Sequence, residues 1–476
     1  MTATDPDSKR PTGMTAFTIV LIGQVLSLLG TAVSQFGLSL WVYDQSGLAT
    51  PMTRIAFWFT LPLIVFTPVV GVMVDRANRK LMMMLSDLAA AFTTLVVLIL
   101  YVSGNLEIWH LYVTAFISGT FQGFQWPAYS AAISTMLDKN DYTRAGAMMD
   151  MAGNSSAVFA PMLAGALLGP LSLWMMRHMP DLAARASGEP GLTALLALDL
   201  VSAAFAIGAL LFVQIPQPVK SEAGRSAEGG FLHQALFGFR YILDRPSLMG
   251  LQLVFLLGNL FITIGFMVQG PMILARTGSD KLIFGSIQTA GAIGGIIGGL
   301  ALSAWGGFKR RVHGVLLGWA FAGLTVVAMG FSQALVPWLV TCFITAMFTP
   351  LINSSNQAIW QSKVPPDVQG RVFASRRLIA WIVTPLSQLI AGPLADKVLE
   401  PMFAQPGTAP SLLAGIFGTG PGAGMGVQLG AAGALSALIG FGGYAFAAIR
   451  NAEERLPDHD AVAPAEPVAA EPAGAA

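Results

Sequence analysis

The most constraining feature of this sequence is a series of long segments that contain no Asp, Glu, Lys or Arg. About 20 predominantly apolar residues cross a bilayer as an α-helix, because no water is present there to satisfy open backbone groups. Each segment here is at least 18 residues long, so the pattern predicts an integral membrane protein made of transmembrane helices. The segments are 11–43, 55–74, 88–106, 108–137, 151–176, 200–219, 246–275, 282–308, 312–362, 378–395 and 401–449.

The composition of the whole chain supports this class. Of 476 residues, 11% are charged and 54% are hydrophobic, whereas an ordinary soluble domain has roughly 25% charged residues. The formal net charge of +1 gives no reason to expect a nucleic-acid partner. The only cysteine, Cys342, excludes an intrachain disulfide and a cysteine-based metal cluster.

Two of the segments need to be divided before the crossings are counted. The segment 312–362 is too long for one crossing and contains breaking residues at 330–333 and at Pro337, so it predicts two helices. The segment 401–449 begins with a Pro- and Gly-rich stretch, which leaves only residues 426–449 to cross. The fold class predicted is therefore all-α, with twelve transmembrane helices.

The distribution of basic residues between the loops predicts the orientation. With the N-terminus inside, the inner segments hold 20 Lys and Arg residues and the outer segments hold 6. Such a bias indicates that both termini are cytoplasmic. No cleavable signal peptide is recognised before the first span. We expect a multi-pass protein of the bacterial cytoplasmic (inner) membrane.

The two halves of the chain repeat each other at an offset of 223–228 residues. Residues 23–30 resemble 250–258, and residues 161–171 resemble 385–394. An internal repeat of six plus six spans is how many secondary transporters are built, with the substrate path between the repeats. The domains expected are a cytoplasmic tail at 1–14, a six-helix bundle at 15–214, a linker with a possible amphipathic helix at 215–246, a second six-helix bundle at 247–450, and a disordered cytoplasmic tail at 451–476.

The loop after the second span contains the most specific motif, which runs from Gly71 to Lys80. Asp75 lies at the C-terminal end of its own helix, where a negative charge is unfavourable. The N-terminus of the eleventh span, which begins after Arg371, offers it a favourable partner. Such a contact would join the two halves only when the inner side is closed. A solvated loop with no gate role is the alternative. The members of the motif are Gly71, Asp75, Arg76, Arg79 and Lys80.

This loop, together with the twelve spans and the duplication, resembles the signature of the major facilitator superfamily. The resemblance implies that the Asp and Arg residues of the loop control the inner gate. Further segments resemble the macrolide- and siderophore-efflux branch of the drug:proton antiporters. One departure is Ala160-Pro161, where the antiporter signature usually reads Gly-Pro. The segments that resemble this branch are 40–44, 368–374, 384–386, 391–396 and 418–422.

Three acidic residues fall inside predicted spans, where a charge is costly and should face a cavity or a partner. Asp199 has no Lys or Arg in its own span, and burial without a counter-charge favours the protonated carboxyl group. It is the first candidate for proton coupling, followed by Asp87 and Asp150. Asp150 also aligns through the repeat with Arg377, so these two, with Arg144, are expected at the inner gate.

Polar residues at helical spacing mark a possible substrate path along the first span of each half. Hydrogen bonding between helices would explain them equally well. The path candidates are Gln24, Ser27, Thr31, Gln35, Gln122, Gln252, Asn259, Thr263 and Asn353.

Other function classes find less support. No Lys lies between Gly and Ser or Thr, so the phosphate loop of an ATP-driven pump is absent. The five His residues form no pair at metal-ligand spacing, so neither an enzyme nor a metal site is indicated, and no cofactor is expected. An ion-coupled uptake symporter, a lipid flippase and a non-transporting scaffold remain open. The favoured function is export of an amphipathic small molecule in exchange for protons, by a monomer in the lipid bilayer.

Overall fold

The computed structural model describes residues 11–76, 78–137, 148, 156, 159–179, 190–215, 231–403 and 410–458. Within these residues the regular elements are all helices. Eleven of the described helices are long and apolar enough to cross a membrane, and α4 (Ile108–Met136), which is 29 residues long, coincides with a further span that the sequence predicts. The predicted all-α membrane fold with twelve spans is confirmed.

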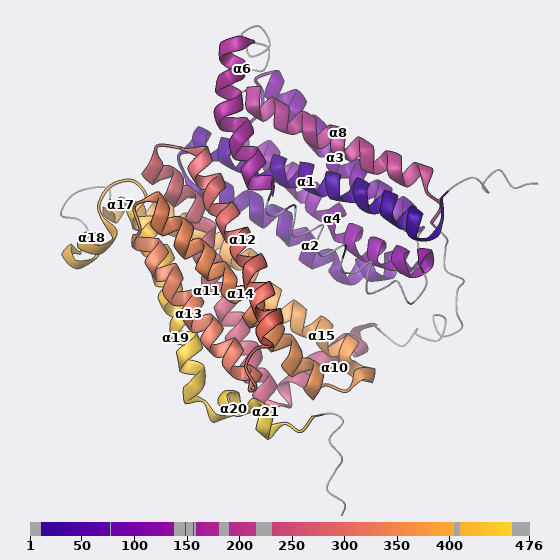
Figure 1. Cartoon of the computed structure of the whole chain (residues 1–476), viewed down its shortest axis with the longest axis vertical. Helices are drawn as coiled ribbons and strands as arrows, with labels where there is room; N and C mark the ends of the chain where they lie inside the picture. Colours follow the sequence, from indigo (N-terminus) through magenta and orange to yellow (C-terminus); the bar gives the residue numbers. More distant parts are fainter. Residues whose placement is uncertain are drawn as a thin grey trace, which may run out of the picture.

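The helices form two bundles, which lie side by side in Figure 1. The first, here called the N-bundle, contains α1 (Gly13–Ser46), α2 (Ala49–Arg76), α3 (Arg79–Val102), α4, a helix over Phe159–His178 that includes η3 (Leu167–Leu171) and α6 (Ser172–His178), and α8 (Pro190–Phe212). The second, the C-bundle, contains α11 (Pro246–Thr277), α12 (Lys281–Trp305), α13 (Arg311–Phe331), α14 (Leu335–Lys363), α15 (Pro366–Trp381), α16 (Val383–Leu394), η4 (Ala395–Leu399), α17 (Glu400–Phe403), α18 (Ser411–Phe417), α19 (Ala423–Gly442) and η5 (Gly443–Ala445).

In the N-bundle, α1 packs against α8, α2 against α4, and α3 against both α4 and α8. Glycines allow two of these approaches. A Cβ on Gly119 would lie 2.0 Å from the carbonyl oxygen of Phe59, so α4 and α2 can meet here only because the side chain is absent. A Cβ on Gly30 would lie 3.1 Å from the Cα of Asp199, which brings α1 directly onto α8.

In the C-bundle, α13 packs against α14 and α19, α12 against α14, and α11 against α16 and α19. The predicted break in segment 312–362 lies between Phe331 and Leu335, where α13 ends and α14 begins. Within the C-bundle, glycines of α13 face glycines of α19. A Cβ on Gly323 would lie 2.6 Å from the carbonyl oxygen of Gly433. The helices therefore touch through their backbones.

The bundles meet in the half of the molecule that the charge bias predicts to be outside. Asp396, in η4 of the C-bundle, accepts hydrogen bonds from the backbone N–H groups of Ala49 (3.0 Å) and Thr50 (2.6 Å) at the start of α2. Lys281 forms an ion pair with Asp44, 2.7 Å apart. Because the first N–H groups of a helix lack partners within it, a carboxylate at this position is favourable.

The same contact continues along α2 and α16. A Cβ on Gly392 would lie 2.5 Å from the Cα of Thr50, so the two backbones lie close together. The amide nitrogen of Gln388 donates to the hydroxyl of Thr60 at 3.2 Å. Between α1 and α12, the rings of Phe36 and Phe284 stack with centroids 5.0 Å apart.

The segment between the bundles contains α10 (Phe231–Leu243), which packs on α15 and α11 of the C-bundle. This helix lies in the region where the sequence suggested an amphipathic one. Its Ile242 is buried, and the hydroxyl of Tyr241 donates to the carbonyl oxygen of Lys363 at 3.5 Å. Residues 216–230 of the predicted linker lie outside the described residues.

The start of the C-terminal tail differs from the expectation of disorder over 451–476. After α20 (Ala447–Arg450), residues Ala452–Arg455 form the short helix α21. Glu453 accepts a hydrogen bond from the N–H of Val312 at 2.9 Å, at the start of α13. The Lys363 ammonium donates to the carbonyl oxygen of Glu453 at 2.6 Å. These contacts at helix ends hold the segment, while 459–476 lies outside the described residues.

Candidate functional site

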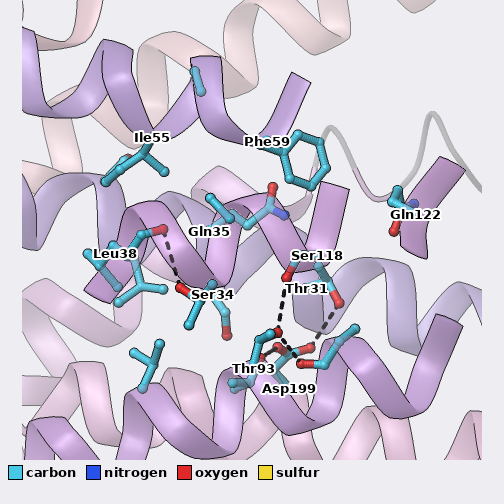
Figure 2. Close-up of a pocket in the computed structure, with 18 of the residues that line it drawn as sticks. Thr31, Ser34, Gln35, Leu38, Ile55, Phe59, Thr93, Ser118, Gln122 and Asp199 are labelled. Atoms are coloured by element: carbon cyan, nitrogen blue, oxygen red, sulfur yellow. Dashed lines mark hydrogen bonds between the residues drawn. The ribbon is translucent and has the colours of Figure 1, made fainter. Parts of the chain in front are cut away.

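A cavity of about 380 Å³ lies inside the N-bundle, between α1, α2, α3, α4 and α8. Figure 2 shows its walls, with Ile55 and Phe59 of α2 facing the same space as Gln35 and Asp199. The lining combines apolar side chains with hydroxyl and amide groups. The polar members are Thr31, Ser34, Gln35, Ser39, Thr60, Thr93, Thr94, Thr114, Ser118, Gln122, Asp199 and Gln388.

Asp199 is the only charged residue in the described part of this lining. Its carboxylate accepts hydrogen bonds from the hydroxyls of Thr31 (3.0 Å) and Thr94 (2.7 Å). Thr31 follows Gly30 on α1, so the close approach of α1 to α8 at that glycine brings the hydroxyl within reach. In the described part of the chain, hydroxyls alone hold this carboxylate.

Asp87 is the second acid in the interior of the N-bundle, but it does not line the cavity. Its carboxylate accepts from the amide nitrogens of Gln24 (2.8 Å) and Gln125 (2.9 Å). The Gln125 amide nitrogen also donates to the side-chain amide oxygen of Gln24 at 2.8 Å. Hydrogen bonds among Gln24, Asp87 and Gln125 therefore join the three helices α1, α3 and α4. The Asp87 carboxylate is enclosed by side-chain amides, whereas the Asp199 carboxylate adjoins space for a ligand.

The predicted substrate-path residues divide into two groups. Thr31, Gln35 and Gln122 line the cavity. The others lie elsewhere. Gln24 belongs to the Asp87 group, and Ser27 is buried. In the C-bundle, Gln252 donates to the carbonyl oxygen of Arg376 at 3.1 Å, Asn259 and Thr263 are partly exposed on α11, and Asn353 is exposed on α14.

Most of the predicted inner-gate set cannot be placed by contacts. Arg144 and Asp150 lie outside the described residues, as do the side chains of Gly71, Asp75, Arg76 and Arg371. Three members are placed. Lys80 donates to the carbonyl oxygens of Leu211 (3.3 Å) and Val213 (2.8 Å) at the end of α8. The Arg377 guanidinium lies 5.3 Å from the ring centre of Trp381. Arg79 begins α3. The contact of Asp75 with the eleventh span remains a prediction.

Sequence reasoning missed Gln388 and Asp396, which join the two bundles. For Asp396 a signal existed, because an acid directly after a charge-free span lies at the unfavourable end of its own helix and needs a partner elsewhere. That argument was applied to Asp75 alone. Gln388 gave no signal, because a single Gln in an apolar span is equally compatible with any helix contact.

Comparison with known proteins identifies the family. The model of the Major Facilitator Superfamily matches residues 14–386. This chain belongs to that superfamily. It is therefore a multi-pass membrane transporter and not an enzyme, and the two bundles are the two halves of the superfamily fold.

The relatives of this transporter include efflux proteins. Macrolide efflux protein A of Streptococcus pyogenes is 24% identical over 389 residues, which cover 80% of this chain and 90% of that protein. The multidrug efflux pump Tap of Mycolicibacterium fortuitum is 24% identical over 381 residues, covering 79% and 88%. The predicted resemblance to the macrolide-efflux branch is confirmed.

Solved structures share the fold of this transporter. A bacterial homologue of the human lysosomal transporter Spinster, in an inward-facing and unoccupied conformation, superposes with a TM-score of 0.66. The match covers 90% of this chain and 97% of that chain, at 14% identity. A D-xylose–proton symporter superposes with a TM-score of 0.58 over 89% and 96%, also at 14% identity.

Proposed function

We propose that this transporter exports an amphipathic small molecule from the bacterial cytoplasm in exchange for protons, by alternating access. The observation that supports it most directly is the cavity around Asp199. Of the lining residues that the structure describes, this is the only charged one, and its described partners are hydroxyls rather than a cation. A cavity inside a helix bundle, lined by apolar walls and a few polar groups, is the usual form of a small-molecule site.

At its position Asp199 can bind a proton and a substrate in turn. A carboxylate inside the membrane needs a compensating partner, and the described residues supply only the Thr31 and Thr94 hydroxyls. A proton can neutralise the carboxylate, and so can a positively charged or hydrogen-bond-donating part of a substrate. If the two exclude each other, release of one accompanies binding of the other, which is the requirement for exchange.

The walls of the cavity favour an amphipathic substrate. Leu38, Met52, Ile55, Phe59 and Val97 supply apolar surface beside the hydroxyl and amide groups. Export rather than uptake is supported by the names of the efflux relatives. One proton that moves through 100 mV releases about 2.3 kcal/mol, which supports a substrate gradient of roughly 50-fold.

Alternating access is supported by the contact between the bundles. Asp396 and Lys281 join the bundles in the half predicted to be outside. Asp75, at the other end of α2, is predicted to make the corresponding contact in the inner half. Opening one side and closing the other would exchange one carboxylate contact at a helix N-terminus for another. In this arrangement the structure corresponds to a state closed on the outside.

The function can be tested in proteoliposomes with an imposed pH gradient, with radiolabelled erythromycin and ethidium as probes. We expect wild-type protein to move a probe against its gradient, and only when the proton gradient runs in the opposite direction. Asp199→Asn should abolish this coupling. Asp87→Asn is the matched control, because Asp87 is also a buried acid but lies outside the cavity. Proton-driven accumulation by Asp199→Asn would contradict the proposal, and uptake that follows the proton would indicate a symporter.

A further inference from the structure

Among the described residues, Gln388 is the only one of the C-bundle that lines the cavity of the N-bundle. It lies on α16 and is 4% exposed. Its amide nitrogen donates to the hydroxyl of Thr60 on α2, 3.2 Å away. Its amide oxygen is enclosed and has no hydrogen-bond partner among the described residues. Gln388 therefore brings to the wall of the N-bundle cavity an amide group whose oxygen is enclosed and unpaired.

Such an atom needs an explanation, because a buried polar group without a partner costs free energy and is uncommon in native proteins. Gln428 on α19 is a useful comparison. Its amide oxygen also lacks a partner, but its nitrogen is fixed by two backbone carbonyls, those of Ala391 (3.0 Å) and Ile264 (3.3 Å). Gln428 does not line the cavity. Only Gln388 combines the unsatisfied oxygen with a position beside space for a ligand.

We propose that Gln388 is the contact between the C-bundle and the transported molecule, and that its amide oxygen accepts a hydrogen bond from an N–H or O–H group of that molecule. The inference rests on the proposed function, because it needs a substrate in the cavity around Asp199. Rotation about the last side-chain bond of Gln388 turns the oxygen toward the cavity, because the torsion before a planar amide is broad. The Gln388 amide oxygen then joins the Asp199 carboxylate among the acceptors of the site.

This pair defines a class of ligand. A molecule that satisfies both acceptors has at least two hydrogen-bond donors, one suited to a carboxylate, such as an ammonium, and one suited to a neutral amide, such as a hydroxyl. Between them it presents apolar surface to Ile55 and Phe59. A purely apolar molecule of the same size would leave the Gln388 oxygen unsatisfied and is disfavoured.

The position of Gln388 also connects the ligand to the contact between the bundles. Gln388, Gly392 and Asp396 follow one another at intervals of four residues, which places them on the same side of a helix. Gly392 approaches the backbone of Thr50, and Asp396 accepts from Ala49 and Thr50. The side of α16 and η4 that closes on α2 is therefore the side that reaches the cavity.

The test is a binding measurement on purified full-length protein in lipid nanodiscs. Three probes are used: radiolabelled erythromycin, ethidium and tetraphenylphosphonium. Erythromycin bears an amine and several hydroxyls, whereas tetraphenylphosphonium is a cation without donors. We expect Gln388→Met to raise the Kd for erythromycin about tenfold, which corresponds to about 1.4 kcal/mol. The Kd for tetraphenylphosphonium should stay within twofold.

Two further variants keep the result interpretable. Gln388→Glu keeps an acceptor and should bind erythromycin within about threefold of wild type, so a loss confined to Gln388→Met is not a folding defect. Gln428→Met removes the comparable buried amide outside the cavity and should leave both Kd values unchanged. Erythromycin binding by Gln388→Met within twofold of wild type, or an equal loss for both probes, would overturn the inference.

Binding by wild type and by Asp199→Asn tests the proposed function separately from the role of Gln388. If wild type binds erythromycin, and Asp199→Asn loses it while Gln388→Met does not, the proposed function survives and the inference fails. If wild type binds none of the three probes, the cavity is not the site of an amphipathic substrate, and both fail together.

Discussion

The two bundles are the two halves of the superfamily fold, yet their interiors are built differently. The N-bundle buries two carboxylates, Asp87 and Asp199, and encloses a cavity. Glycines bring helices into backbone contact in both bundles, but at more positions in the described part of the C-bundle, as between Gly330 and Gly426. The comparison teaches that two bundles of one fold need not share their chemistry: the first holds the described cavity and the buried carboxylates, and the second is packed more closely through its glycines.

Two charged residues of the C-bundle stabilise helix ends within that bundle. Arg276 donates to the carbonyl oxygen of Gly330 at 3.0 Å, where α13 ends. Glu400 accepts from the N–H groups of Gly422 (3.1 Å) and Met425 (2.7 Å), where α19 begins. Each charge has the sign that the helix end favours. Asp396 and Lys281, by contrast, reach across to the N-bundle.

The largest effect should come from filling a backbone contact in the C-bundle. A Cβ on Gly298 would lie 2.4 Å from the carbonyl oxygen of Met347, whereas a Cβ on the next residue, Gly299, would meet nothing within 4 Å. Gly298→Val should destabilise the protein by about 3 kcal/mol or more, the upper range for overpacking. Thermal unfolding of the purified protein measures the change. Gly299→Val should unfold close to wild type, and an equal loss in both variants would show that tight packing is not what distinguishes this bundle.

A smaller effect is expected in the interior of the N-bundle. Asp87→Asn replaces a carboxylate that accepts from Gln24 and Gln125 by an amide with only one acceptor atom. One hydrogen bond to a charged group is lost, which corresponds to about 2 kcal/mol of stability. Unfolding in a denaturant series measures it, with Ser86→Ala as a nearby control that removes one neutral hydrogen bond to Phe121. Full coupling to the proton gradient should persist, and its loss would make Asp87 a transport site.

A smaller effect still is expected when one charge is removed from the contact between the bundles. Asp396→Asn removes the charge at the start of α2, which corresponds to about 1 kcal/mol and about a fivefold change in the population of the state closed on the outside. Spin labels at the exposed positions Leu48 and Val398 report the distance across this contact. Glu400→Gln is the control, because Glu400 caps α19 within its own bundle. A distance distribution unchanged by Asp396→Asn would remove this residue from the gate.

The smallest effect concerns the C-terminal segment. Asp458 forms an ion pair with Lys363 at 2.8 Å, but its side chain is 52% exposed. Exposed ion pairs contribute about 0.5 kcal/mol or less, so Asp458→Asn should leave the melting temperature within about 1 °C. Lys363→Met should have the larger effect, because the ammonium is buried and also bonds two backbone carbonyls. Equal effects of both variants would show that the ion pair, not the contact at the helix end, holds the segment.

The sequence predicted the helices well because apolar length is a local property. Even the break between Phe331 and Leu335 was visible in the order of residues. Asp199 was also predictable as a buried acid without a cation in its own span. Its partners were not, because Thr94 lies 105 residues away and only the packing of α3 on α8 brings it near.

The same limit explains the missed residues and the tail. Asp396 meets α2 across 347 residues of chain, so its partner depends on how the bundles dock. Residues 452–455 look disordered by composition, yet Lys363 and the start of α13 supply partners that composition does not reveal. Hydrogen bonds between residues far apart in the sequence are therefore what the pattern of residues could not predict.

The confinement of the cavity to one bundle has a consequence for how such a transporter can evolve. The N-bundle contributes 20 of the 21 described lining residues, so selection for a new transported molecule should gather substitutions in the first half of the chain. The second half can then diverge in sequence while it preserves its shape, and descendants that transport different molecules would differ most in the half that lines the cavity.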